Sequence, residues 1–237
     1  MSYVRMSQVY DLIYTNRKDY AAEAAQVARL IGEYCPPATS LLDVACGTGL
    51  HDQYLARRFA LTGTDLSPEQ LAVARQRLPD VALHLADMRT MDLGSRFDAV
   101  TCLFSAIGHM TTIEDLQTAI STMARHLSPA GVLIIEPWLH PEDVIDGKVS
   151  LDQYQTPDVS VQRTVLATLE HEGQLTHLEM HHLVGHTGHS VEHFIEDHLL
   201  GNYTVAEYLQ AIRQAGLAPH HLTPGLTGRG LFIGVAP

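Results

Sequence analysis

Acidic residues follow strand-like segments in the first half of the chain, where they could bind a ligand. The stretch LLDVACGTG at residues 41–49 contains Gly47 and Gly49, ALTGTD ends in Asp65, and VALHLAD ends in Asp87. Glycines after a strand let the backbone approach a ligand closely, and a carboxylate accepts hydrogen bonds from a hydroxyl pair or an amino group. The spacing therefore predicts a site for a small molecule that carries a ribose and an amino-bearing base.

The residue at position 52 discriminates between two kinds of nucleotide ligand. A dinucleotide-binding turn ends its G-x-G-x-x-G pattern in a small residue, whereas this chain has Asp52 there. A carboxylate at that position would oppose a pyrophosphate, so the pattern disfavours NAD. It favours an adenosyl donor without phosphates, with Asp65 on the ribose and Asp87 and Met88 on the adenine. A purely structural strand-to-helix turn is the remaining interpretation.

The composition indicates one globular α/β domain. The chain has 237 residues, of which 46% are hydrophobic, and this is enough for a single core. The net charge of −12 and the absence of a basic stripe argue against a nucleic acid partner. No run is apolar enough for a membrane helix or a secretion signal, and three scattered cysteines suggest no disulfide framework. We expect a cytoplasmic protein that binds neither nucleic acid nor membranes.

Strand and helix signals alternate from residue 19 to residue 138. Strands are predicted at residues 41–45, 60–65, 81–87, 97–104 and 132–138. Helices are predicted between them, one of them with a capping box of Thr111 and Glu114. This alternation is typical of a doubly wound parallel sheet, whose ligands bind at the carboxyl ends of the strands.

The pattern changes after residue 140. Three extended runs at residues 161–170, 174–184 and 190–200 are separated by polar turns, and they predict an antiparallel meander before a last helix and two short strands. The expected fold class is α/β: a Rossmann-like, doubly wound, seven-stranded, mainly parallel sheet with an inserted antiparallel β-meander. The expected organisation is a single domain made of four parts: a helical cover (1–35), a donor-binding core (36–140), a substrate cap (141–200) and a carboxyl-terminal helix and hairpin (201–237).

The meander is rich in histidine, with HHLVGHTGHSVEH at residues 181–193. Side chains alternate between the two faces of a strand, so positions 181, 183 and 185 share a face that contains one histidine of that strand. His193 and His198 face opposite ways by the same argument. We therefore predict no metal site.

Several motifs, taken together, carry a family resemblance: VYDLIY, KDYAAEA, LLDVACGTG, LHLADMR, CLFSAIGHM, RHLSPAGVLIIEPW and TGRGLFIGVAP. With them the chain resembles the class I S-adenosylmethionine-dependent methyltransferases. More narrowly, it looks like the enzymes that dimethylate TDP-linked amino sugars in antibiotic pathways. The resemblance implies S-adenosylmethionine as methyl donor, a nucleotide-linked amino sugar as small-molecule substrate, and a possible homodimer.

The resemblance also implies roles for individual residues. Donor contacts would come from Tyr10, Tyr20, Ala45, Gly47, Asp65, Asp87, Met88 and Ser105. The first two would close over the donor, Ala45 and Gly47 would meet its methionyl part, and Ser105 would lie beside the sulfonium. On the acceptor side, His109 would face the sugar amine, with Tyr3 as a second catalytic candidate. Glu136 and Trp138 would line the sugar pocket, with Glu136 also orienting the amine, and Arg229 would contact the diphosphate.

Two rival functions use the same donor residues. A methyltransferase for another small molecule, acting on oxygen or a carboxylate, would retain the glycine turn and change Glu136, Trp138 and Arg229. A non-catalytic protein that binds S-adenosylmethionine would retain the turn and lack an open acceptor pocket.

Overall fold

The computed structural model describes residues 10–237, so Tyr3 lies outside the described part of the chain. Within that part, no helix combines the length and the apolar character that a membrane crossing requires.

A seven-stranded sheet forms the centre of the molecule, in the order β10-β11-β5-β4-β1-β2-β3. Its strands are β1 (Ser40–Val44), β2 (Ala60–Asp65), β3 (Ala82–Leu85), β4 (Phe97–Cys102), β5 (Leu127–Ile135), β10 (Ala218–Leu222) and β11 (Leu231–Val235). The first five are parallel, and the closing hairpin of β10 and β11 adds to β5 in the antiparallel direction. The predicted seven-stranded, mainly parallel sheet is therefore confirmed.

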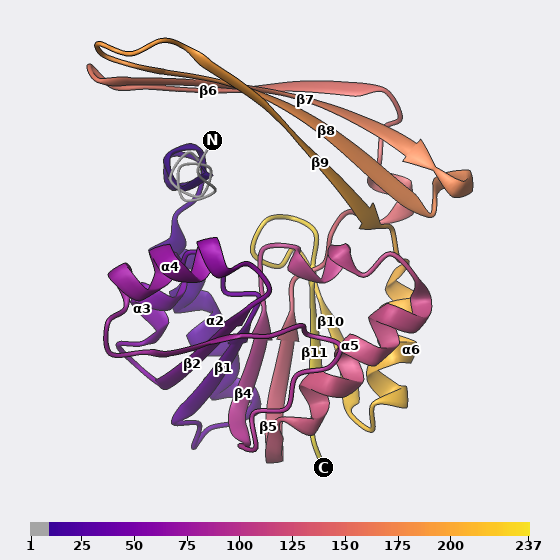
Figure 1. Cartoon of the computed structure of the whole chain (residues 1–237). Helices are drawn as coiled ribbons and strands as arrows, with labels where there is room; N and C mark the ends of the chain where they lie inside the picture. The colour runs from indigo at the N-terminus through magenta and orange to yellow at the C-terminus, as the bar shows by residue number, and fades with distance from the viewer. Residues whose placement is uncertain (1–9) are drawn as a thin grey trace.

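Helices cover both faces of this sheet (Figure 1). They are α2 (Tyr20–Tyr34), α3 (Asp52–Leu55), α4 (Pro68–Arg77), α5 (Ile113–Arg125) and α6 (Val205–Gln214). Side-chain caps fix where they begin: Asp19 accepts from the Ala22 N–H at 2.9 Å at the start of α2. The capping box predicted for Thr111 and Glu114 is wrong by one residue, because Thr112 caps α5 by accepting from the Asp115 N–H.

Neighbouring residues of the central strands point into different layers of the core. Leu41 of β1 packs with Val27 and Ile31 of α2, while Leu42 packs with Leu116 and other residues of α5. Both leucines are completely buried, which stabilises the fold by roughly 1.5–3 kcal/mol for each side chain. This two-sided burial explains why the parallel strands read as continuous apolar runs.

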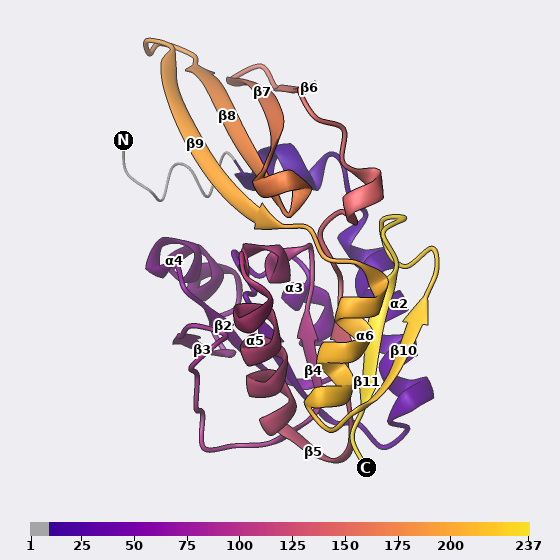
Figure 2. The ribbon, with the colours of Figure 1, turned by 90° about the vertical axis from the view of Figure 1, so that its right-hand side faces the viewer.

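A second, antiparallel sheet is inserted between β5 and α6. It contains four strands: β6 (Lys148–Gln155), β7 (Val159–Glu170), β8 (Leu175–His186) and β9 (Glu192–Gly201). The sequence predicts only the last three of them. Figures 1 and 2 show this sheet above the central sheet, on the side where the helical segment at residues 10–15 also lies. We call the face toward that segment, which carries Val161, the inner face, and the opposite face, which carries Leu183, the outer face.

The segment at residues 10–15 connects the two sheets. Ile13 is buried against Val161 and Val184 on the inner face. On its other side, Asp11 accepts a hydrogen bond from the Thr48 hydroxyl at 2.6 Å and pairs with Arg77 of α4 at 2.6 Å. The aromatic residues of this segment are therefore fixed between the glycine turn and the inserted sheet.

Candidate active site

The glycine turn and Asp65 form one hydrogen-bonded unit at the carboxyl ends of β1 and β2. Ala45, Gly47 and Gly49 have φ angles of 59°, 60° and 76°, in the left-handed region that favours glycine. Asp65 accepts from the Gly47 N–H at 2.8 Å with one carboxylate oxygen and from the Ser67 N–H at 2.8 Å with the other. Burial raises the pKa of Asp65. Since each oxygen can accept again, Asp65 remains able to bind a hydroxyl pair.

A buried pair of carboxyl groups lies beneath this turn. Asp43 accepts a hydrogen bond from the Thr101 hydroxyl at 2.6 Å, while no N–H or O–H group of residues 10–237 reaches either oxygen of Asp52. Burial and the adjacent Asp43 raise the pKa of Asp52 well above its usual range. The neutral, protonated form of Asp52 is therefore favoured beside Asp43. The Asp52 side chain faces the interior, which differs from the ligand-facing position that the sequence suggests, and α3 after it has only four residues.

This acid pair predicts the effect of replacing Asp52 with asparagine. An acid with a raised folded-state pKa stabilises the fold fully below its unfolded pKa of about 3.9 and loses that contribution as the pH rises toward the folded value. We expect Asp52→Asn to raise the free energy of unfolding at pH 7, by about 1.4 kcal/mol for each pH unit between the unfolded pKa and either the folded pKa or pH 7, whichever is lower. Urea unfolding across pH 4 to 8 measures this, with exposed Asp80→Asn as control. An Asp52→Asn stability difference that does not grow with pH would contradict the protonated state of Asp52.

A lysine ammonium lies among aromatic rings close to the glycine turn. Lys18 Nζ is 3.7 Å from the centre of the Phe104 ring and 3.0 Å from Glu23 Oε2. His51 also contacts Glu23, at 2.8 Å, and its ring packs on buried Tyr20 at 4.7 Å. Although burial opposes it, these contacts lower the pKa of Glu23. The cluster can therefore accommodate a positive charge.

Aromatic side chains extend this cluster toward the inserted sheet. The ring centres of Tyr10 and Tyr14 are 4.4 Å apart, and those of Tyr14 and Phe104 are 4.8 Å apart. Burial, with a smaller effect of Tyr14, raises the pKa of Tyr10 well above its usual range. The sequence indicates Tyr10 and Tyr20 and misses Tyr14, Lys18 and Phe104.

Glu136 supports the turn that follows β4. The resemblance implies that it lines the sugar pocket, whereas its side chain is fully buried in this structure. It accepts from the Phe104 N–H at 2.7 Å and from the Thr227 hydroxyl at 2.7 Å. Phe104 and Ser105 have φ angles of 52° and 64°, so this turn is strained for residues other than glycine. Glu136 therefore stabilises an unfavourable backbone conformation beside the site.

This turn brings the predicted donor-side residue Ser105 together with two predicted acceptor-side residues, Trp138 and Arg229. The Ser105 hydroxyl donates to the Pro137 carbonyl at 2.7 Å and accepts from the Arg229 guanidinium. The same guanidinium lies 4.8 Å from the Trp138 ring, and the buried Trp138 Nε1 has no partner within residues 10–237. Burial lowers the pKa of Arg229, though a guanidinium remains charged at neutral pH.

Asp87 is engaged more strongly than the sequence suggests. Its carboxylate pairs with Arg89 at 2.6 Å, and Arg89 also pairs with Asp115 at 3.1 Å. Hydrogen bonds from Arg89 lower the pKa of Asp87. The Met88 side chain, which the sequence places near the adenine, packs at the edge of the hydrophobic core with 9% of its surface exposed. The Asp87 carboxylate keeps lone pairs beyond those that accept from Arg89.

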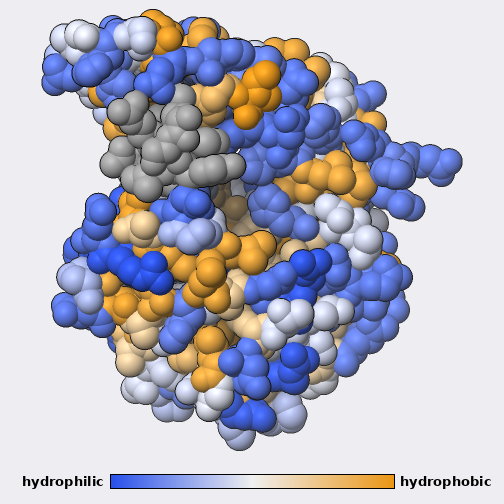
Figure 3. Space-filling view, viewed as in Figure 1, coloured by the Kyte–Doolittle hydropathy of each residue, from blue (hydrophilic) through white to orange (hydrophobic). Residues whose placement is uncertain are grey.

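His109 ends a short 3₁₀ helix, η1 (Ala106–His109), below strand β9. The His109 side chain is exposed to solvent, and the centre of the His198 ring is 5.6 Å away. Desolvation by the surrounding protein, followed by the effect of His198, lowers the pKa of His109 to about 4. His109 is therefore neutral at pH 7 and can accept a hydrogen bond. Figure 3 shows the molecular surface hollowed between the inserted sheet and the core.

The arrangement fits an α/β methyltransferase: the glycine turn and Asp65 lie at the ends of β1 and β2, and neutral His109 and the Arg229 guanidinium follow β4 and β10. Comparisons with known proteins agree. The family model described as "Methyltransferase domain" matches residues 41–131. The chain is 45% identical over 231 residues to the dTDP-3-amino-3,4,6-trideoxy-alpha-D-glucopyranose N,N-dimethyltransferase of Streptomyces venezuelae, with 97% of each chain covered.

Solved structures agree with that relative. The crystal structure of Streptomyces venezuelae DesVI has a TM-score of 0.93 at 43% identity, with 98% of each chain covered. The structure of SAM-bound CalS10, an amino pentose methyltransferase from Micromonospora echinaspora involved in calicheamicin biosynthesis, has a TM-score of 0.88 at 42% identity, with 97% of each chain covered. The chain belongs to the S-adenosylmethionine-dependent sugar N-methyltransferases.

Proposed function

We propose that this enzyme transfers a methyl group from S-adenosylmethionine to the amino group of a TDP-linked deoxyamino sugar in an antibiotic pathway. The observation that carries the proposal is the combination of neutral His109 with the Ser105, Trp138 and Arg229 cluster. His109 can accept a proton, and the Arg229 guanidinium can bind a diphosphate. This local cation is needed because the net charge of −12 repels anionic ligands at long range. The relatives named above act on amino sugars, which supports the same substrate class.

The donor-side residues fit S-adenosylmethionine. Its sulfonium supplies an electrophilic methyl group and needs surroundings that tolerate a cation. The rings of Phe104 and Tyr20 face the Lys18 ammonium, and Tyr14 packs on Phe104, so aromatic faces at this position tolerate a cation. Asp65 would hold the ribose hydroxyls, with Ala45 and Gly47 at the methionyl end. Tyr20 would support the cover, and Asp87 with the Met88 backbone would meet the adenine.

On the acceptor side, the chain's residues would orient the amine and remove its proton. Arg229 would hold the diphosphate through parallel N–H···O bonds, and Trp138 would border the sugar. His109 would accept the proton that the amine loses when its nitrogen bonds to the methyl carbon. Glu136 would act by keeping the Phe104–Ser105 turn in place, and Tyr3 remains a second candidate for contact with the amine.

A panel of acceptors tests this function. The purified enzyme would be incubated with methyl-labelled donor and three compounds: a TDP-amino sugar, the same sugar without the nucleotide, and the TDP sugar with a hydroxyl in place of the amine. We expect rapid labelling of the first compound alone. Labelling of the hydroxyl compound at a similar rate would favour the rival oxygen methyltransferase, and donor binding without any transfer would favour the non-catalytic alternative.

We further infer that the four parts of the chain act as one unit in the cytoplasm. Residues 1–35 would cover the donor, residues 36–140 would bind it, residues 141–200 would cap the sugar, and residues 201–237 would complete the sheet. Cys35, Cys46 and Cys102 form no disulfide within residues 10–237, which fits a reducing compartment.

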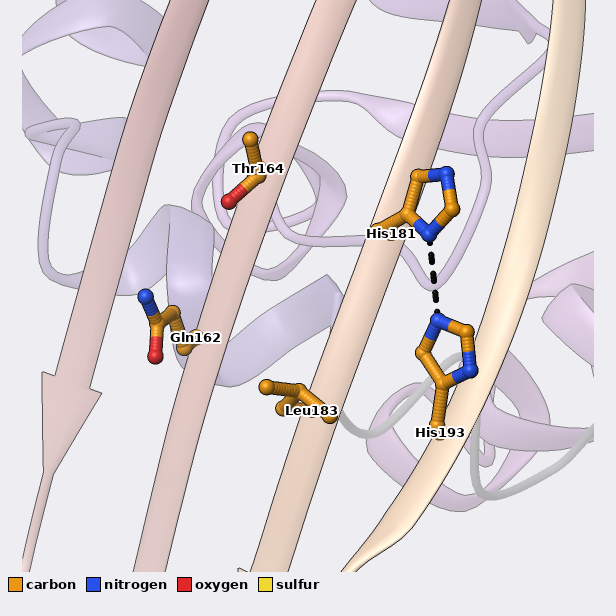
Figure 4. A pocket seen from close by; sticks show the side chains of 5 residues that line it. All are labelled: Gln162, Thr164, His181, Leu183 and His193. Atoms are coloured by element: carbon orange, nitrogen blue, oxygen red, sulfur yellow. Dashed lines mark hydrogen bonds between the residues drawn. The ribbon is translucent and has the colours of Figure 1, made fainter.

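We also propose that two copies associate through the outer face of the inserted sheet. This face exposes several large aliphatic side chains, namely Val149, Leu151, Leu183, Ile195 and Leu199. The same face has a shallow cavity of about 430 Å³, away from the active site and lined in part by Leu183. In this cavity, His181 Nδ1 and His193 Nε2 lie 3.1 Å apart across neighbouring strands (Figure 4). The pairing of β8 with β9 thus brings His181 and His193 together. The alternation of side chains within a single strand, on which the sequence argument relied, could not predict this contact. Within residues 10–237, no group of three or more potential ligands has the arrangement of a metal site.

Oligomeric state tests this interface. We expect sedimentation equilibrium to give twice the chain mass for the wild type and the mass of one chain for the double variant Leu183→Glu/Ile195→Glu, because unpaired charges in an apolar interface are costly. Leu66→Glu is the matched control, since Leu66 is 66% exposed on the core. A double variant that remains dimeric would place the interface elsewhere.

A further inference from the structure

His198 is a second imidazole at the acceptor side, contributed by the inserted sheet. It lies on the inner face of β9, and its ring is tilted by 53° against His109, with the ring centres 5.6 Å apart. Burial lowers the pKa of His198, against the opposing effects of Glu196 and Asp197. Both rings are therefore neutral at pH 7. Each neutral imidazole has one ring nitrogen whose lone pair can accept a hydrogen bond from an incoming N–H group.

The end of β9 is held firmly against η1, which fixes the relative position of the two rings. The Tyr203 hydroxyl donates to the Met110 carbonyl at 2.6 Å. A Cβ atom on Gly201 would lie 2.4 Å from the same carbonyl, so only glycine allows this approach. Asn202 donates to the Gly173 carbonyl at 2.9 Å and accepts from Thr176, which connects this junction to strand β8. These contacts hold strand β9 in place, so the position of His198 relative to His109 is fixed.

The separation of the rings matches the geometry of one shared amine. Two acceptors that each lie about 2.9 Å from one tetrahedral nitrogen are themselves about 4.7 Å apart. Ring centres 5.6 Å apart place ring nitrogens in that range after small rotations about the side-chain bonds. Within residues 10–237, no hydrogen bond joins the His109 and His198 rings. The acceptor nitrogen of each ring is therefore free to bind the substrate amine.

We propose that His198 is a second acceptor for the substrate amine, so that His109 and His198 together hold the two N–H bonds of a primary amine while its lone pair points at the methyl group. This inference rests on the proposed function. In the transfer, the N–C bond forms and the C–S bond breaks, and the electron pair of that bond remains on sulfur. The resulting ammonium then loses one proton to an imidazole nitrogen.

The two successive methylations should depend on His198 to different extents. A primary amine has two N–H bonds to be oriented, and the monomethylated amine has one, which His109 alone can hold. We expect His198→Phe to slow the first transfer by about 10- to 100-fold, which corresponds to about 1.4 to 2.7 kcal/mol. The second transfer, measured separately with the monomethylated sugar, should change by less than about threefold.

Three further measurements separate this role from a structural one. His198→Gln retains an acceptor and should recover most of the first rate, whereas His193→Asn, on the outer face of the same strand, should leave both rates unchanged. Ring-carbon NMR of labelled histidine, with the primary amino sugar and S-adenosylhomocysteine bound, should show both His109 and His198 resonances shifted. Equal slowing of both transfers by His198→Phe, or no shift of the His198 resonance, would overturn the proposal. A wild type that transfers no methyl to either sugar would instead refute the proposed function.

Discussion

Replacing Asp65 with asparagine is expected to weaken the binding of S-adenosylhomocysteine by about 100-fold, the largest donor-side effect of any single substitution. The carboxylate receives the Gly47 and Ser67 N–H groups, both at 2.8 Å, and keeps lone pairs for the two ribose hydroxyls. The amide nitrogen of asparagine can accept none of these bonds, and each bond to a charged acceptor contributes about 1.5–3 kcal/mol. Isothermal titration calorimetry measures the change directly.

The control for this experiment separates donor binding from folding. Asp80→Asn removes an exposed carboxylate just beyond the neighbouring helix α4 and should leave the dissociation constant unchanged. Because Asp65 also fixes the glycine turn, the Asp65→Asn protein should unfold at a lower temperature but remain folded at 20 °C. An Asp65→Asn protein that is folded and binds S-adenosylhomocysteine within fivefold of the wild type would remove Asp65 from the donor site.

Replacing Arg229 with methionine is expected to raise KM for a TDP-amino sugar by about 100-fold and to leave donor binding unchanged. The guanidinium lies on the Trp138 ring and hydrogen-bonds to Ser105, so its position is fixed before any substrate arrives. Fixed, partly desolvated cations form strong bidentate contacts with phosphate oxygens. A chain with a net charge of −12 has no long-range attraction to replace them.

Steady-state kinetics of Arg229→Met and Arg229→Lys test this role. The lysine variant retains the charge and loses the fork of donors, so it should fall between the wild type and the methionine variant. Arg213→Met, which removes an exposed guanidinium at the end of α6, is the matched control. If KM for the TDP sugar stays within threefold in Arg229→Met, the diphosphate is bound elsewhere.

The parts of the fold that depend on local sequence are predictable. The parallel strands are recognisable because they are buried on both faces, as Leu41 and Leu42 illustrate. Glycine and acid positions at the strand ends follow from the same local pattern, since they need no knowledge of distant residues. Strand β6 escaped prediction because its side chains are largely exposed, so its sequence has little apolar alternation to detect.

The parts of the site that depend on long-range contacts could not be predicted. His198 meets His109 only because β9 packs on η1, and Lys18 meets Phe104 only because the amino-terminal segment folds over β4. Glu136 was expected to line the sugar pocket, and its two partners, Phe104 and Thr227, come from separate loops. The type of each residue indicated which chemistry it could perform. It did not indicate which of its atoms would already be hydrogen-bonded to other parts of the chain.

The most direct test of the central claim is to identify the atom that receives the methyl group. The enzyme would be supplied with donor carrying a carbon-13 methyl group and with a TDP-amino sugar, and the product examined by carbon–nitrogen correlation NMR. The account predicts that the label is bonded to the sugar nitrogen, first as a monomethylamine and then as a dimethylamine. Label on a sugar oxygen, or on no atom of the sugar while the donor remains bound, would contradict it.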